Sequence, residues 1–302
     1  MKAMILAAGL GTRLLPYTLK RPKPLFPVLN KELLHLTINR IRQAGALEIV
    51  VNAHHLRLQI KKALEAEKNI VLQEEEKILG TGGGLRLALE HFGKDPVLVA
   101  NGDIYHSIDY SETYQAHCKS RADVTLVLHD YPRFNDVGVD ETLHITRFSR
   151  SGGGMSQNER VLAFTGIHVI NPEVLQLIPP ATTCCIIDCY RKLLQQGGSI
   201  KAHIATDHFW TDMGTPADYL KLHADLLEQR VPVYEELRGK AGEAPFVGVQ
   251  NAFIGKNAKL LDWVCIGKGA RIEAGATVQR TIVWDGAVVP AGSLIKDAIV
   301  TP

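Results

Sequence analysis

Branched apolar residues recur every six positions near the C-terminus, and this repeat constrains the fold more than any other feature of the sequence. The repeat comprises Ile254, Leu260, Ile266, Ile272 and Val278, and after a five-residue step Val283, Val289 and Ile295. Small or branched residues follow four places after most of these positions, at Ala258, Val264, Ala270, Ala276, Ala287 and Ser293. Such a period is typical of short strands that wind into a triangular solenoid, with the aliphatic side chains pointing inward. The sequence therefore predicts a short parallel β-helix over residues 250–302.

Residues 1–228 show a different pattern, in which apolar β-type runs alternate with helical periodicity. The expected strands are Ala3–Ala8, Glu48–Asn52, Ile70–Leu72, Val97–Ala100, Val124–Leu128, Leu162–Ile170 and Ile200–Ala205. The expected helices are Lys31–Ala44, Leu56–Glu67, Gly84–His91, Ile186–Gln196 and Pro216–Glu228. This alternation predicts an α/β domain with a Rossmann-like, mostly parallel sheet that is flanked by helices. Residues 229–249 lose the periodicity and are expected to form a linker.

The composition gives no reason to expect nucleic acid or a membrane as a partner, because 34 Lys and Arg residues nearly balance 32 acidic residues. The N-terminal apolar run ends at a glycine and has no signal-peptide cleavage pattern, so a cytoplasmic location is expected. The five cysteines lack a paired CxxC layout, which favours reduced thiols. Cys184, Cys185 and Cys189 lie close enough for a metal site, but they also fit the start of an amphipathic helix.

The turn after the first expected strand carries residues suited to a phosphate chain. Gly9 and Gly11 let the backbone pass close to phosphates, and Arg13 adds a guanidinium that can contact a phosphate with two hydrogen bonds. A dinucleotide-binding fingerprint would need a third glycine at Leu14, and a Walker loop would end in Gly-Lys-Ser/Thr, so neither accounts for this turn. Lys23 follows between two prolines, which stiffen the segment that carries it.

These motifs resemble the signature of the nucleotidyltransferases that make sugar nucleotides. The matching segments are Gly-Leu-Gly-Thr-Arg at 9–13, Pro-Lys-Pro at 22–24, the glycine-rich element at 79–84, Asn-Gly-Asp at 101–103 and Trp-Thr-Asp-Met-Gly-Thr-Pro at 210–216. The finest resemblance is to the branch of mannose-1-phosphate guanylyltransferases and muramate-1-phosphate uridylyltransferases, and it covers residues 1–226. It implies the GT-A-like fold of that family, and the C-terminal repeats resemble the left-handed parallel β-helix.

The resemblance also implies a reaction and a set of site residues. The family transfers a nucleoside monophosphate from a nucleoside triphosphate to a sugar 1-phosphate, releases pyrophosphate and uses Mg²⁺. The implied catalytic residues are Arg13, Lys23, Asp103 and Asp212. The two basic residues would hold the phosphates, and the two aspartates would hold the metal ion. Taken alone, Asp103 could equally be a turn former and Asp212 a helix cap. The implied nucleotide-binding residues are Leu6, Ala8, Gly9, Gly11, Thr12, Gln73, Gly82 and Gly83.

The sugar phosphate is expected to contact Asn101, Gly138, Arg150 and Thr165. The best-known relatives carry a Glu-Lys pair after the position of Phe148, where this chain has Arg150 and Ser151. Arg150 is therefore a candidate to contact the sugar phosphate in their place. The expected nucleotide is GTP or UTP.

Two other functions can be weighed against this one. A non-catalytic relative that keeps the fold for binding or assembly would usually lose the charged site residues, whereas all four are present here. Acyltransferase activity in the repeats would need a histidine base, but all 12 histidines lie at or before His223. The repeats are instead expected to serve a structural role or to form the contact surface of a homo-oligomer.

Overall fold

The computed structural model describes residues 1–148 and 159–302, and the chain divides into two compact units. Unit 1 comprises Met1–Leu10, Ile38–Gly102 and Ile108–His208, and unit 2 comprises Gly11–Thr37, Asp103–Ser107 and Phe209–Pro302. Unit 2 therefore joins segments from distant parts of the sequence, and it contains all of the C-terminal repeats.

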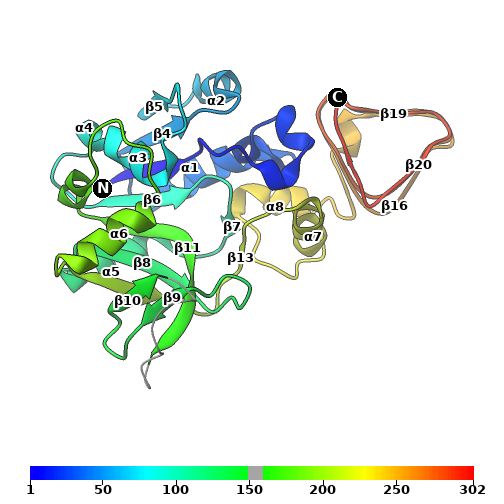
Figure 1. Ribbon diagram of the computed structural model, residues 1–302. Helices are drawn as coiled ribbons and strands as arrows, with labels where there is room; N and C mark the ends of the chain where they lie inside the picture. The colour runs from blue at the N-terminus through cyan, green and yellow to red at the C-terminus, as the bar shows by residue number, and fades with distance from the viewer. Residues whose placement is uncertain (149–158) are drawn as a thin grey trace. The chain divides into compact units, whose positions relative to one another are not determined.

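A nine-stranded sheet forms the centre of unit 1 (Figure 1). Its strands are β1 (Lys2–Leu6), β4 (Glu48–Ala53), β5 (Ile70–Glu74), β6 (Val97–Asn101), β8 (Val124–His129), β9 (Val137–Val139), β10 (Ile145–Phe148), β11 (Arg160–Ile170) and β12 (Ile200–Ile204). The strands β6, β1, β4 and β5 are successive parallel neighbours, and β8 is parallel to β12. The long strand β11 runs antiparallel to β6, β8 and β9. Each predicted strand is present, so the α/β class with a mostly parallel sheet is confirmed.

Helices pack along this sheet and complete the core of unit 1. They are α1 (Leu33–Gln43), which begins in unit 2, α2 (Arg57–Leu64), α3 (Gly80–Leu87), α4 (Leu89–Phe92), α5 (Tyr110–Ser120) and α6 (Ile186–Gln195), with a 3-10 segment η4 (Pro172–Leu177). The core gathers apolar side chains such as Met4, Val50, Leu85 and Tyr190. Cys189 lies in it as well, on the helix that the cysteine-rich segment predicted. None of the helices among the described residues combines the length and the apolar character that crossing a membrane requires.

The first part of unit 2 is built from three 3-10 turns, four two-residue strands and two helices. They are the 3-10 turns η1 (Thr12–Leu14), η2 (Tyr17–Leu19) and η3 (Lys23–Leu25), the hairpin β2 (Pro27–Val28) and β3 (Lys31–Glu32), the strands β7 (Tyr105–His106) and β13 (Trp210–Thr211), and the helices α7 (Pro216–Leu227) and α8 (Glu235–Ala241). Thr215 caps α7 by accepting a hydrogen bond from Asp218 N at 3.1 Å, and Pro216 occupies the first helical turn. The helix α8 lies within residues 229–249, which the sequence predicts as a linker.

The C-terminal repeats form stacked parallel coils that outline a triangle in Figure 1. Their elements are β14 (Phe246–Val247), η5 (Val249–Asn251), β15 (Phe253–Ile254), β16 (Lys259–Ile266), β17 (Arg271–Ile272), β18 (Thr277–Val283), β19 (Val288–Val289), β20 (Leu294–Lys296) and β21 (Ile299–Val300). Ile254 pairs with Ile272, three repeats further along, and Ile272 pairs with Val289. The register between β16 and β18 shifts after Leu261, because the five-residue step shortens one side of the coil.

The repeated aliphatic residues fill the interior of these coils, as the period predicts. Ile266, Ile272, Val278, Val283 and Val289 are buried, together with the small residues between them. The parallel β-helix is therefore present. The left-handed direction in which its chain winds and its role in a homo-oligomer stay predictions.

Candidate active site

Two basic and two acidic side chains converge in unit 2. Arg13 Nη1 lies 2.9 Å from Asp212 Oδ2, and Lys23 Nζ lies 2.9 Å from Asp103 Oδ2. Lys23 Nζ also donates a hydrogen bond to Asp212 O. The first of these pairs joins residues 199 positions apart in the sequence, and the second joins residues 80 positions apart. The structure thus brings together the four residues that the motifs predict as catalytic.

The two carboxylates meet because short strands pair just beside them. Asp103 precedes β7 and Asp212 follows β13, and these strands are antiparallel with Tyr105 opposite Thr211. Asp212 is fixed further, since its Oδ1 accepts a hydrogen bond from Gly214 N at 3.1 Å. The short pairing of β7 with β13 therefore brings Asp103 and Asp212 to the same place.

Two glycines shape the surroundings of Arg13. Gly11 has a φ of 63°, in the left-handed region that favours glycine, and its carbonyl accepts a hydrogen bond from Thr18 Oγ1. A Cβ atom on Gly214 would lie 2.4 Å from Arg13 Nη1 and 2.6 Å from Asp212 Oδ2, so a side chain at this position would displace the ion pair. The side chain of Arg13 is 56% exposed and can therefore reach a bound anion.

Lys23 has the opposite environment, because its side chain is only 5% exposed. Burying an ammonium group is costly unless it is paired, and here Asp103 neutralises it while the carbonyl of Asp212 accepts a second hydrogen bond from it. The side chain of Asp103 is 36% exposed and reaches solvent. Lys23 is thus held in one geometry beside a carboxylate that a ligand could approach.

In unit 1, several predicted nucleotide-binding and sugar-binding residues form one row across the sheet. The parallel register places Asn101 beside Leu6, Leu6 beside Asn52, and Asn52 beside Gln73. Ala8 and Gly9 follow β1 directly, and the Ala7 N–H donates to Asn52 Oδ1 at 2.8 Å. Open α/β sheets bind ligands at this carboxyl edge of the strands.

A buried carboxylate joins this row to the glycine-rich element. Glu75 is 2% exposed, and its Oε1 accepts a hydrogen bond from Asn52 Nδ2 at 2.7 Å. Its other oxygen accepts from Leu79 N at 3.2 Å, just before α3 begins. Gln73 Nε2 donates to Gly84 O at 3.0 Å, so its amide also holds the middle of α3. Glu75 and Asn52 therefore fix the strands and the helix relative to one another.

The glycines of α3 are required by close packing within unit 1. A Cβ atom on Gly82 would lie 2.8 Å from Cys184 Sγ, and one on Gly83 would lie 2.4 Å from Thr182 O. The Gly82 N–H donates to Cys184 O at 3.0 Å. The helix predicted from Gly84 consequently begins at Gly80, because glycine is tolerated there in exchange for this contact.

Two of the predicted sugar-phosphate residues, Gly138 and Thr165, lie outside the row that contains Asn101. Thr165 is buried, and its hydroxyl donates to Val127 O at 2.8 Å and accepts from Ile167 N at 3.2 Å, so it is engaged with the sheet. A Cβ atom on Gly138 would lie 2.2 Å from Glu159 Oε1, so this glycine lets β9 pack against that carboxylate. Arg150 lies outside the described residues.

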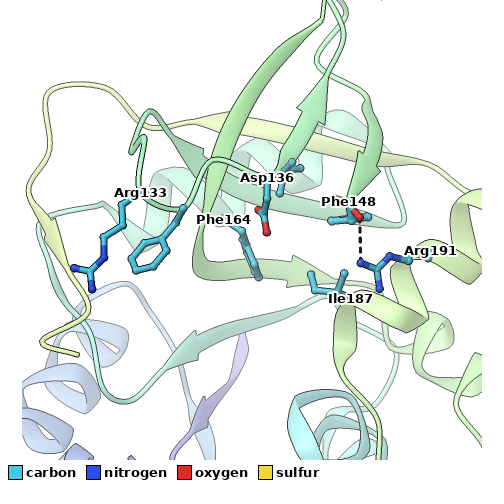
Figure 2. A pocket seen from close by; sticks show the side chains of 8 residues that line it. Arg133, Asp136, Phe148, Phe164, Ile187 and Arg191 are labelled. Carbon is cyan, nitrogen blue, oxygen red and sulfur yellow. Dashed lines mark hydrogen bonds between the residues drawn. The ribbon is translucent and has the colours of Figure 1, made fainter. Parts of the chain in front are cut away.

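The chain neighbours of Gly138 and Thr165 line a cavity of about 610 Å³ in unit 1 (Figure 2). Its walls are formed by Arg133, Phe134, Asp136, Val137, Phe148, Phe164, Ile187 and Arg191. Figure 2 shows Phe164 from β11 and Ile187 from α6 pointing into the same space. Arg191 Nη2 donates to Phe148 O at 3.1 Å. Aromatic faces beside charged groups suit a small polar ligand with a flat apolar face.

Residues 2–229 match the family model described as nucleotidyl transferase. The chain belongs to the nucleotidyl transferase family. Mannose-1-phosphate guanylyltransferase from Mycobacterium tuberculosis is 29% identical to this nucleotidyltransferase over 302 residues, which cover 97% of this chain and 82% of the relative. UTP–glucose-1-phosphate uridylyltransferase from Synechocystis is 27% identical over 322 residues, which cover 99% of this chain and 82% of the relative.

Solved structures share the fold of this nucleotidyltransferase. HddC from Yersinia pseudotuberculosis superposes with a TM-score of 0.62 at 23% identity, covering 74% of this chain and 97% of HddC. The same protein has been solved in complex with GMP-PN, with a TM-score of 0.62 at 22% identity. The likeness confirms the nucleotidyltransferase fold.

The sequence motifs did not reveal every residue that builds the site of this nucleotidyltransferase. Asn52 and Glu75 carry the buried network, and Phe148, Phe164 and Arg191 line the cavity. A polar residue at the end of an apolar strand, as at Asn52, is a signal that could have found the first pair. The cavity residues carry no comparable signal, since aromatic residues in strands are usually part of a core.

Proposed function

We propose that this nucleotidyltransferase transfers a nucleoside monophosphate from GTP or UTP to a sugar 1-phosphate and releases pyrophosphate. The observation that supports the proposal most is the convergence of Arg13, Lys23, Asp103 and Asp212 in unit 2. The names of the relatives support the choice of substrates, since one is a guanylyltransferase of mannose 1-phosphate and another a uridylyltransferase of glucose 1-phosphate.

The carboxylates of this site fit Mg²⁺. Hard divalent cations bind carboxylate and phosphate oxygens, and two aspartates are enough when a nucleotide contributes further ligands. Asp103 and Asp212 would hold the ion, and both have charged partners that can turn to other anions. When bound, Mg²⁺ would neutralise phosphate charge and draw the two substrates together.

Arg13 and Lys23 would change partners when the triphosphate binds. In the structure each neutralises an aspartate, whereas the bound phosphates would offer both cations a stronger anionic partner. The exposed guanidinium of Arg13 would then bind the departing pyrophosphate. The buried ammonium of Lys23 would lie beside the α-phosphate and stabilise charge that develops there.

The chemical step would be an in-line displacement. An oxygen of the sugar 1-phosphate forms a bond to the α-phosphorus while the bond from that phosphorus to pyrophosphate breaks on the opposite side. A phosphate monoester is largely ionised at neutral pH, so the step requires positioning and charge neutralisation rather than a strong base. The five free cysteines support a cytoplasmic setting for this reaction.

A substrate screen tests the proposal. The full chain is incubated with Mg²⁺, each of GTP, UTP, TTP, ATP and CTP, and a panel of sugar 1-phosphates, and pyrophosphate release is measured. We expect release with GTP or UTP and at least one hexose 1-phosphate, with the matching sugar nucleotide identified by its mass. If no combination releases pyrophosphate while a sugar nucleotide binds, the non-catalytic alternative is correct.

A further inference from the structure

The segment that carries Lys23 is held by little local structure. We call residues 16–26 the Lys23 loop. Its backbone hydrogen bonds close short turns, such as Lys20 N to Tyr17 O at 3.0 Å and Phe26 N to Lys23 O at 2.9 Å. Short 3-10 turns have poor hydrogen-bond geometry and do not by themselves fix where a loop lies. The position of Lys23 must therefore depend on side chains that anchor the loop.

One tryptophan of the β-helix provides such an anchor within unit 2. Trp284 follows β18 directly and is 1% exposed. Its ring centroid lies 4.9 Å from that of Phe26 in an edge-on arrangement and 6.3 Å from that of Tyr17. The guanidinium carbon of Arg21 lies 4.8 Å from the centroid of the indole. Three side chains of the Lys23 loop, on both sides of Lys23, thus surround one ring.

The neighbouring residue strengthens this anchor. Asp285 Oδ2 lies 3.8 Å from Arg21 Nη2, so the cation that covers the indole is also paired with a carboxylate. The same carboxylate accepts a hydrogen bond from Lys268 N at 2.7 Å, one coil earlier. Trp284 N donates to Val300 O at 2.9 Å, one coil later. Both anchoring residues are therefore tied to adjacent coils of the β-helix.

We propose that Trp284 is a positioning residue for Lys23, so that the β-helix acts as a rigid support for the phosphate-binding loop. The inference rests on the proposed function, because it assigns Lys23 to the reaction. A lysine displaced by about 1 Å can cost about 10²-fold in rate. Loss of the anchor should therefore lower kcat more than it raises the KM for the triphosphate.

The chain offers a matched control at Trp263, the other buried tryptophan of the β-helix. Its ring stacks on His223 of α7 at a centroid distance of 6.4 Å, and it is 5% exposed. The variants Trp284→Leu and Trp263→Leu remove the same group from similar burial. They should lower the melting temperature to a similar degree, whereas only the first removes contacts to the Lys23 loop.

The experiment measures kcat, KM, melting temperature and amide hydrogen exchange of residues 17–26 in the full-length variants. We expect Trp284→Leu to lose about 30- to 100-fold in kcat with KM changed less than about threefold, and Trp284→Phe to recover most of that loss. Exchange in residues 17–26 should quicken about tenfold in Trp284→Leu and stay at the wild-type rate in Trp263→Leu. Equal losses of kcat in the two leucine variants, or unchanged exchange in the loop, would overturn the proposal.

Two further arms cover the remaining cases. If Trp284→Leu does not fold, Arg21→Met and Asp285→Asn decide, because they leave the indole in place. Their side chains are 18% and 54% exposed, and the changes should lower kcat about 3- to 10-fold while lowering the melting temperature far less than Trp284→Leu does. Wild-type kcat in both would overturn the proposal. If the wild-type chain releases no pyrophosphate, the proposed function fails, and the exchange rates of residues 17–26 alone decide whether Trp284 holds the loop.

Discussion

Replacing Lys23 by methionine should separate the proposed catalytic role of this residue from its structural role. The change removes a hydrogen bond to the Asp103 carboxylate and another to Asp212 O, while a buried apolar side chain of similar length stays in place. The charged ammonium donates both, and a hydrogen bond that involves a charged group contributes about 1.5–3 kcal/mol. Because Asp103 reaches solvent and regains hydration, we expect a net loss of about 1–3 kcal/mol in the free energy of unfolding.

The expected loss of activity is larger than this loss of stability suggests. A preorganised charge that stabilises a transition state is commonly worth about 10²–10³ in kcat. The Lys23→Met variant should therefore be folded at 25 °C, as measured by urea denaturation, yet release pyrophosphate about 10²–10³ times more slowly. Lys31→Met, at an exposed lysine on β3, is the matched control and should keep wild-type rates. A Lys23→Met variant with kcat/KM within about threefold of wild type would refute the role given to this lysine.

Three further changes test other parts of the structure. Gly214→Ala should lower turnover at least about tenfold, since its Cβ would lie 2.6 Å from Oδ2 of Asp212, the proposed metal ligand, and an unchanged steady-state rate would contradict this. Glu75→Gln places an NH₂ group against a donor, either Asn52 Nδ2 or Leu79 N, and should lower the free energy of unfolding by about 2–3 kcal/mol in urea denaturation. A loss below about 0.5 kcal/mol would show that these hydrogen bonds do not stabilise the fold. Burial lowers the pKa of His168 to about 3, so only the unfolded chain binds a proton there as the pH falls below about 6.5. The contribution of His168 to the free energy of unfolding should thus be fully present at pH 7.5 and reduced by about 1.4 kcal/mol at pH 5.5. His168→Phe should remove this decrease, and an unaltered pH dependence in the variant would contradict the buried neutral imidazole.

The β-helix could be predicted closely from the sequence, because its six-residue period maps directly onto the sides of a coil. Even the five-residue step at Val278 reappears, as the register shift between β16 and β18. The strands of unit 1 could be predicted for a similar reason, since they are apolar runs bounded by turn residues. The helix α5 was not predicted, because the residues it buries are Tyr110, Thr113 and His117, which form no apolar stripe.

The charged residues of the site could be predicted because each stands in a short segment of distinctive composition. Their convergence could not be derived from local pattern, since it depends on β7 and β13, each two residues long and without periodicity. The role of Trp284 was equally hidden from the sequence. Its partners Phe26 and Arg21 lie more than 200 positions earlier, and only tertiary packing within unit 2 brings them together.

In the proposed reaction, Asp103 and Asp212 act together on one cation beside a bound triphosphate. The most direct test is a double-mutant cycle in which Mg²⁺-dependent pyrophosphate release is measured for Asp103→Asn, Asp212→Asn and the double variant. Groups that hold the same ion have non-additive effects, so we expect each single variant to lose about 10²–10³ in kcat and the double variant to lose little more. Losses that multiply in the double variant, or near-normal release by either single variant, would show that the two aspartates do not share one ion.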